Sequence, residues 1–258
     1  MRRGLVASRA AAQEAIGEGR VLVGGAVADK AARLVGPGEP LVVAPSEQGW
    51  VSRGGTKLDA ALTRFSIAVD DARCLDAGAS TGGFTDILLA RGAGLVWAVD
   101  VGRGQLHERL ARHDRVMARD RTNIRLATLD DVGGVPFDIV VADLSFISLR
   151  TVAPVLVGEM ARDGADLVCL VKPQFEAGRK VVSAGKGVVR DPAAWRDALL
   201  GVGHALEAEE AAIMGAMTSP LRGADGNVEF LLWARAHAAG GYGIEALADS
   251  AVAEVSEA

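Results

Sequence analysis

Short apolar runs alternate with amphipathic stretches along most of the chain. Seven apolar runs have the length and composition of buried strands, at residues 73–76, 95–99, 115–118, 137–142, 166–171, 211–217 and 228–235. Apolar side chains recur at the spacing typical of helices at residues 53–65, 83–91, 104–112, 149–161 and 192–207. Because strands and helices alternate, we expect a parallel sheet covered by helices.

The last two predicted strands follow each other without a helix between them. Such a pair favours a final antiparallel hairpin at the edge of the sheet. This closing hairpin is typical of class I S-adenosylmethionine-dependent methyltransferases and not of nucleotide dehydrogenases. The predicted fold class is therefore α/β, with a Rossmann-like class I methyltransferase domain.

The first 45 residues follow a different pattern, a helix at 8–18 with Ser8 as N-cap and then three brief strand-like runs at 20–23, 27 and 41–43. A small α+β unit is expected there. The predicted division is an N-terminal domain at 1–45, a linker at 46–53, a methyltransferase domain at 54–236 and a tail at 237–258. The Ala-rich tail is expected to be a short helix or frayed.

Composition narrows the class of protein. Half of the 258 residues are hydrophobic, and Cys74 and Cys169 both lie in apolar runs, which indicates buried free thiols in a reducing compartment. The four histidines show no metal-ligand spacing, so no metal site is expected. No secretory signal and no apolar run of about 18 residues is found, so we expect a soluble cytoplasmic protein without membrane contact.

Charge is distributed unevenly. The whole chain carries −5, yet the first 35 residues have six basic side chains against three acidic ones, a net +3. A basic end on an acidic body points to a polyanion partner for that end. A solvated helix face is the competing interpretation for so short a run.

A small-residue turn, CLDAGASTGGFT, follows the first predicted strand. Its glycines do not fit the G-x-G-x-x-G spacing of a pyrophosphate-binding turn. Asp76 at the strand tip could instead receive the ammonium group of a methionine-derived cofactor, although the turn could also merely start a helix close to the sheet. Asp100 ends the next strand, where an acid can bind a ribose. Either Asp120 or Asn123 could reach the adenine edge, and a solvated turn is the competing interpretation for both.

Charged residues also end two buried strands, which packing alone explains poorly. Asp143 follows FDIVVA and Lys172 follows LVCLV, so both should lie at the carboxyl edge of the sheet. Lys57, in SRGGTKL, and Glu229, in GNVEFLL, flank the domain in comparable settings.

These four residues match, in type and order, the Lys-Asp-Lys-Glu tetrad of the FtsJ-related ribose 2′-O-methyltransferases. The motifs VSRGGTKL, LDAGASTGGFTD, DLSFISL, LVKPQFE, GKGVVRD and SPLRGADGNVEF closely resemble one branch, the TlyA or hemolysin A family. The resemblance covers residues 2–236. It implies S-adenosylmethionine-dependent 2′-O-methylation of cytidines in ribosomal RNA, of the large subunit and in some members also of the small subunit.

The resemblance also implies the site. Lys57, Asp143, Lys172 and Glu229 are the expected catalytic residues, with Lys172 at the ribose hydroxyl either as base or as orienting donor. The second lysine and burial would lower the pKa of Lys172, and the two acids would raise it. The residues expected at the cofactor are Asp76, Gly78, Ala79, Ser80, Thr81, Gly82, Gly83, Phe84, Asp100, Val101, Asp120, Asn123 and Asp143.

The N-terminal residues SRAAAQEAIGEGRVLVGG resemble the S4 RNA-binding module, whose earlier first helix is represented here only by MRRGLV. That resemblance implies ribosomal RNA as partner. A basic loop after the catalytic lysine is interpreted as an RNA-contacting segment or as a plain exposed loop. The RNA-binding candidates are Arg3, Arg9, Arg20, Arg179, Lys180, Lys186, Arg190 and Arg222.

Two other classes of function compete with methyl transfer. A membrane-lytic protein is suggested by the hemolysin name, but the sequence has no spanning segment and no long amphipathic basic helix. The second competing class is an RNA-binding protein whose methyltransferase domain is inactive. The intact tetrad argues against this class.

Overall fold

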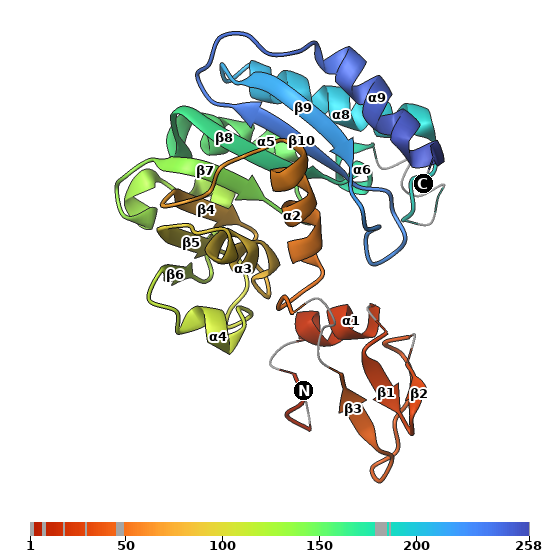
Figure 1. The fold of residues 1–258 in the computed structure, drawn as a ribbon. Coiled ribbons are helices and arrows are strands. Elements are labelled where there is room, and N and C mark those ends of the chain that lie inside the picture. Colours follow the sequence, from red (N-terminus) through yellow and green to blue (C-terminus); the bar gives the residue numbers. More distant parts are fainter. Residues whose placement is uncertain are drawn as a thin grey trace.

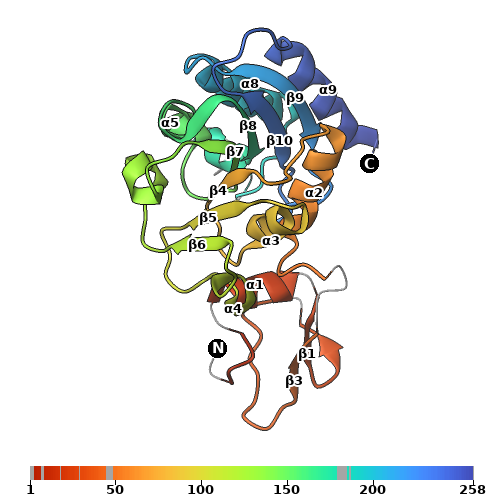
Figure 2. The same cartoon turned by 60° about the vertical axis from the view of Figure 1, so that its left-hand side comes forward.

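The computed structural model describes residues 3–6, 9–17, 19–28, 30–44, 49–178, 185 and 187–257. These residues build two separate sheets, one of three strands near the N-terminus and one of seven strands in the rest of the chain (Figure 1). Helix α1 faces the larger unit, while the strands of the small sheet extend away from it (Figures 1 and 2).

The small unit packs one helix on a short antiparallel sheet. Its elements are α1 (Arg9–Gly17), β1 (Val21–Val23), β2 (Ala26–Val27) and β3 (Leu41–Val43), with strand order β2-β1-β3. Ala15 of α1 and Val21 and Val23 of β1 form its buried core. The proposed N-cap Ser8 lies outside the described residues.

The large sheet has the order β6-β5-β4-β7-β8-β10-β9. Its strands are β4 (Arg73–Ala77), β5 (Leu95–Val99), β6 (Val116–Arg119), β7 (Phe137–Ala142), β8 (Ala161–Val171), β9 (Ala212–Thr218) and β10 (Phe230–Arg235). The first five run parallel, and β10 pairs antiparallel with both β8 and β9. The α/β class and the closing antiparallel hairpin are thereby confirmed.

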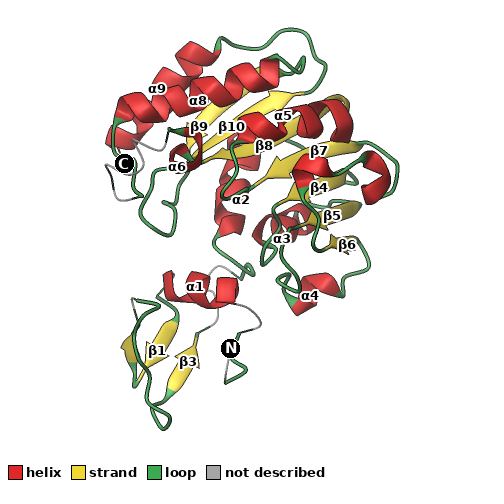
Figure 3. Ribbon diagram, turned by 180° about the vertical axis from the view of Figure 1, so that it is seen from behind, coloured by secondary structure: helices red, strands yellow, loops and turns green. Residues whose placement is uncertain are grey.

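Helices cover both faces of this sheet, each over its own apolar core (Figure 3). The regular helices are α2 (Gly54–Arg64), α3 (Gly83–Ala90), α4 (Glu108–Ala111), α5 (Leu149–Ala153), α6 (Pro173–Glu176), α8 (Pro192–Glu207) and α9 (Ile244–Glu257). Short helical turns occur at η1 (Ile124–Leu126) and η2 (Leu129–Val132), and a π-helical segment, η3, at Pro154–Met160. Helices α2 and α3 lie on one face, and α5, α8 and α9 on the other.

Two predicted helices are regular α-helices over only part of their length. The helix predicted at 104–112 is regular only over α4, because Gly104 adopts a left-handed φ of 59° and its N–H donates to the Asp120 side chain. The helix predicted at 149–161 gives way to η3 at Pro154, and β8 already starts at Ala161. The strand predicted at 166–171 is therefore five residues longer at its start.

The C-terminal residues are not an appended tail, which corrects the predicted end of the domain at 236. Helix α9 packs on β9 and α8, and its Ile244, Ala248 and Ala251 are buried in the core of that face (Figure 3). Ala248 and Ala251 lie three residues apart on the buried side of the helix and allow a close approach, whereas Ala246 and Ala253 are exposed. Of the two expected alternatives, the structure therefore has a helix and not a frayed end. Of the helices in the described ranges, none combines the length and the apolar character needed to cross a membrane.

Candidate active site

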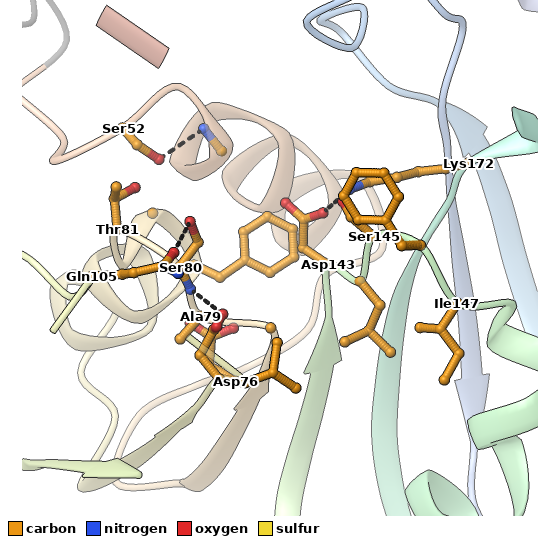
Figure 4. A pocket seen from close by; sticks show the side chains of 18 of the residues that line it. Ser52, Asp76, Ala79, Ser80, Thr81, Gln105, Asp143, Ser145, Ile147 and Lys172 are labelled. Carbon is orange, nitrogen blue, oxygen red and sulfur yellow. Dashed lines mark hydrogen bonds and ion pairs between the residues drawn. The ribbon is translucent and has the colours of Figure 1, made fainter. Parts of the chain in front are cut away.

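A cavity of about 730 Å³ opens at the carboxyl ends of β4, β5, β7 and β8 (Figure 4). One part of its wall is the small-residue turn after β4, and another part carries the four tetrad residues. Ligands of open α/β sheets bind at this edge, where the loops after successive strands converge. The predicted cofactor turn and the predicted catalytic residues therefore share one cavity.

The turn after β4 needs glycine at two positions for different reasons. Gly78 has a φ of 87°, and a Cβ there would lie 2.5 Å from the main-chain oxygen of Asp143. Gly82 has a φ of 98°, and a Cβ there would meet the side chains of Leu106 and Leu110. Both positions therefore require glycine for packing within the protein, in addition to any approach by a ligand.

Asp76 is fully buried at the tip of β4. Its Oδ2 accepts hydrogen bonds from the Thr85 main-chain N–H (2.9 Å) and hydroxyl (2.6 Å), while Oδ1 has no protein donor among the described residues. Burial raises the pKa of Asp76 to about 7, against the opposing hydrogen bonds from Thr85 and with help from the nearby Asp143 and Asp100 charges. An ammonium group brought by a ligand would satisfy Oδ1 and the charge together.

Asp100 also lines the cavity, with both carboxylate oxygens already bonded to the chain. Oδ2 accepts the Ser80 N–H at 2.9 Å, and Oδ1 accepts the Gly102 N–H at 2.6 Å. A carboxylate has further lone pairs, so these bonds orient it and leave capacity for ribose hydroxyls.

The structure separates the two candidates for the adenine edge. Asn123 lines the cavity, whereas Asp120 is exposed, does not line it, and accepts the Gly104 N–H at 2.7 Å. Asn123 is therefore the better placed of the two for a ligand in this cavity. Gly82 is likewise absent from the cavity wall, because it packs against Leu106 and Leu110. The remaining predicted cofactor residues all line the cavity: Asp76, Gly78, Ala79, Ser80, Thr81, Gly83, Phe84, Asp100, Val101, Asn123 and Asp143.

The four tetrad residues form two ion pairs. Lys57 of α2 and Glu229, just before β10, are joined at 2.5 Å between Nζ and Oε2 and are both buried. Lys172 at the end of β8 and Asp143 at the end of β7 are joined at 2.6 Å between Nζ and Oδ1 (Figure 4). Four segments far apart in the sequence thus bring two cations and two anions to one wall of the cavity.

In the Lys172–Asp143 pair, each residue stabilises the charged form of the other. Burial by itself would lower the pKa of Lys172, but the Asp143 and Glu229 carboxylates outweigh it and raise that pKa. Burial would raise the pKa of Asp143, but Lys172, Lys57 and Arg53 together hold it below its ordinary value. Lys172 is therefore a protonated donor at neutral pH in this state, which favours the orienting role over the role of base.

Several cavity residues were missed from the sequence. Ser145 accepts a hydrogen bond from Lys172 Nζ at 3.0 Å, and Gln105 lies beside Ser80 in the cofactor turn. Phe146 is 93% exposed at a φ of 65° and contacts Phe175 with ring centroids 5.2 Å apart. Ser145 and Phe146 lie in the motif DLSFISL, but their positions depend on a backbone bend that no pattern of residues indicates.

The proposed RNA contacts lie in several settings. The Arg3 guanidinium donates to the main-chain oxygens of Glu39, Gly36 and Pro37, and Arg20 donates to that of Ala44 at 2.9 Å, so both also hold the small domain together. Arg190 and Arg222 are exposed. Arg179, Lys180 and Lys186 lie outside the described residues, as does the side chain of Arg9.

Within the described ranges, no group of three or more His, Cys, Asp or Glu side chains is placed to hold a metal ion. Cys74 and Cys169 are buried free thiols, and burial raises the pKa of each to about 12. Both thiols are therefore protonated and unreactive at neutral pH.

The sheet order, the closing hairpin and the cavity at the strand ends define a class I methyltransferase. Residues 50–236 match the family described as FtsJ-like methyltransferase, and residues 2–41 match the S4 domain. The chain belongs to the FtsJ-like methyltransferase family and is an enzyme of that type, with an S4 domain at its N-terminus.

Individual relatives narrow the branch. The chain is 49% identical over 258 residues to the 16S/23S rRNA (cytidine-2′-O)-methyltransferase TlyA of Mycobacterium tuberculosis, covering 100% of this chain and 95% of the relative. It is 44% identical to the putative rRNA methyltransferase YqxC of Bacillus subtilis, over 89% of this chain and 81% of the relative. A solved putative hemolysin from Streptococcus thermophilus superposes with a TM-score of 0.80 at 35% identity, covering 99% and 93% of the two chains. The resemblance to the TlyA family is confirmed.

Proposed function

We propose that the protein methylates the 2′-oxygen of cytidine ribose in ribosomal RNA of the large subunit, and the relative named for 16S/23S rRNA adds the small subunit as a second candidate substrate. The observation that carries this proposal is the meeting of the Lys57–Glu229 and Lys172–Asp143 pairs in the cavity that also contains the cofactor turn. Relatives whose names specify cytidine 2′-O-methylation of rRNA support it. A ribosomal substrate also supports a cytoplasmic location.

S-adenosylmethionine is the proposed cofactor, and the residues present fit it. Asp76 offers its unpartnered buried oxygen to the ammonium group, Asp100 its oriented carboxylate to the ribose, and Asn123 its amide to the adenine. When bound, the cofactor supplies an electrophilic methyl group on sulfur. No metal is assigned a role.

The tetrad positions the nucleophile. A ribose 2′-hydroxyl is a poor nucleophile at neutral pH, and its oxygen must lie in line with the methyl group. The protonated Lys172 donates to that oxygen and fixes its position, while Asp143 holds Lys172 in place. The proton that the hydroxyl loses on methylation passes to solvent water in the cavity. Lys57 and Glu229 form the buried support beside this pair.

The hemolysin name of the Streptococcus relative suggests a membrane-lytic alternative. Membrane lysis assigns no role to paired charges around a cofactor cavity, so methyl transfer explains more of the structure. The proposal is tested with purified protein, ribosomal subunits and S-adenosylmethionine labelled in the methyl group. Label should enter the RNA of wild-type reactions, and its absence from both subunits would contradict the proposal.

The pH dependence of cofactor binding tests the role of Asp76. Because the pKa of this carboxyl is raised to about 7, its charged form becomes populated only as the pH approaches neutrality. Affinity for S-adenosylmethionine should rise by up to about tenfold per pH unit below this pKa and then level off. Calorimetry from pH 5.5 to 7.5 measures the rise, which the Asp76→Asn variant should lack. If the affinity of the wild-type protein for S-adenosylmethionine did not change with pH, Asp76 would not be the contact of the ammonium group.

The salt dependence of RNA binding tests the role of Arg222. This exposed side chain lies in the loop that leads to Glu229, so it is well placed for a phosphate near the target ribose. Arg222→Ala should weaken RNA binding and reduce the slope of log affinity against log salt by about one. Arg162→Ala, an exposed arginine at the start of β8 and so at the opposite sheet edge, is the matched control. An unchanged slope for Arg222→Ala would exclude it from the RNA footprint.

A further inference from the structure

We propose that Ser145 and Glu176 are positioning residues that together fix the direction in which the Lys172 ammonium group donates. This inference rests on the proposed function, because it concerns how Lys172 meets the ribose hydroxyl. Neither residue belongs to the tetrad, and neither was singled out by the sequence patterns. The contacts between two segments, residues 143–149 after β7 and residues 172–176 after β8, carry the inference.

The first contact orients the ammonium group itself. Lys172 Nζ lies 2.6 Å from Asp143 Oδ1 and donates to Ser145 Oγ at 3.0 Å (Figure 4). A lysine ammonium has three N–H groups and rotates freely about its last bond. Two acceptors held by the protein stop this rotation, and the direction of the third N–H is then set. With Asp143 alone, the ammonium group could still turn about that single contact.

The second contact holds the segment that bears Ser145. Glu176 is only 7% exposed, and both of its carboxylate oxygens are bonded to this segment. Oε2 accepts from the Ser148 hydroxyl at 2.5 Å, and Oε1 accepts from the Leu149 main-chain N–H at 2.7 Å. The Leu149 N–H belongs to the first turn of α5, where amides have no partner within the helix. Glu176 therefore anchors the end of the segment, three and four residues after Ser145.

Glu176 reaches this position because α6 starts directly after Lys172. One short stretch thus carries the ammonium group at one end and the anchoring carboxylate at the other. Arg150 reinforces the link, because its Nη2 donates to the main-chain oxygen of Glu176 at 2.9 Å and its Nε lies 3.4 Å from Glu176 Oε2. The rings of Phe146 and Phe175 add a contact between the same two segments.

These contacts form a closed loop of interactions, from Lys172 to Ser145, along the chain to Ser148, across to Glu176 and back to Lys172. Loss of the contact at Ser145 or of the contact at Glu176 should therefore misdirect the same N–H of the Lys172 ammonium group. A misplacement of about 1 Å at a reacting group can cost on the order of a hundredfold in rate. A cap of α5 without a positioning role would affect stability but would leave the rate of the folded enzyme unchanged.

The test compares Ser145→Ala, Glu176→Gln and the double variant in methyl transfer to ribosomal subunits. Each single variant should lower kcat by about tenfold to a hundredfold. The KM for the subunit and the calorimetric affinity for S-adenosylmethionine should stay at wild-type values. The double variant should be no slower than the slower single variant, because both changes release the same group. Ser145→Thr, which keeps the hydroxyl, should recover most of the rate.

Two exposed residues serve as matched controls, Ser250→Ala on α9 and Glu207→Gln at the end of α8, and both should behave as wild type. Thermal melting identifies any variant that fails to fold. If Glu176→Gln fails to fold, the comparison of Ser145→Ala with Ser145→Thr decides whether the Ser145 hydroxyl positions Lys172. Wild-type kcat for Ser145→Ala, or losses that multiply in the double variant, would overturn the inference alone. An inactive wild-type protein would instead overturn the proposed function and this inference with it.

Discussion

Lys172→Ala should abolish methyl transfer while the protein still binds S-adenosylmethionine. In the proposed mechanism the Lys172 ammonium holds the ribose oxygen in place, and it lies at the end of β8, away from the cofactor turn after β4. Loss of a positioned catalytic donor typically costs on the order of a hundredfold to ten-thousandfold in rate. Single-turnover transfer to ribosomal subunits measures the rate, and calorimetry measures cofactor binding.

A second variant separates loss of charge from loss of volume. Lys172→Met keeps most of the side-chain length and should be as inactive as Lys172→Ala. Both variants leave Asp143 without its closest cation, although this carboxylate is 24% exposed and can be hydrated. Near wild-type transfer by either variant would show that Lys172 does not contact the reacting ribose.

Lys57→Met should cause the largest loss of stability among the site variants. It leaves the Glu229 carboxylate, whose side chain is 3% exposed, without the cation that lies 2.5 Å away. Removing one partner of a buried ion pair typically costs about 3–5 kcal/mol, because the remaining charge is then uncompensated. Thermal and denaturant unfolding of the full chain measure this loss.

The double variant Lys57→Met/Glu229→Leu tests the cause. Replacing both partners by apolar side chains of similar size is often neutral, so most of the lost stability should return while methyl transfer stays absent. If the double variant were as unstable as Lys57→Met alone, the destabilisation would not arise from the unpaired Glu229 charge.

Much of the large domain could be predicted from the sequence, because its signals are local. The buried strands read as continuous apolar runs, since both faces of the sheet are covered by helices. The carboxyl ends of parallel strands meet at one edge, so Asp143 and Lys172 could be expected close together from their positions alone. Their roles as members of a tetrad came from the family resemblance, not from spacing.

Other features depend on contacts between segments far apart in the chain. Asn123 lines the cavity and Asp120 does not, because the Gly104 N–H binds the Asp120 side chain sixteen residues away. The packing of helix α9 could not be predicted for the same reason. An Ala-rich segment can fray or pack closely, and which of the two occurs depends on the segment that lies opposite it. Glu176 was unremarkable in KPQFEAG, and its burial follows only from its contacts with Ser148 and Leu149.

The position of the transferred methyl group is the most direct test of 2′-O-methylation by this site. Ribosomal RNA from each subunit, treated with the wild-type protein and S-adenosylmethionine, can be digested and mapped by mass spectrometry, with Lys172→Ala as the negative control. We expect a new methyl group on the 2′-oxygen of a cytidine, found with the wild-type protein and absent with the variant. A methyl group on a base, or one that also appears with Lys172→Ala, would contradict this expectation.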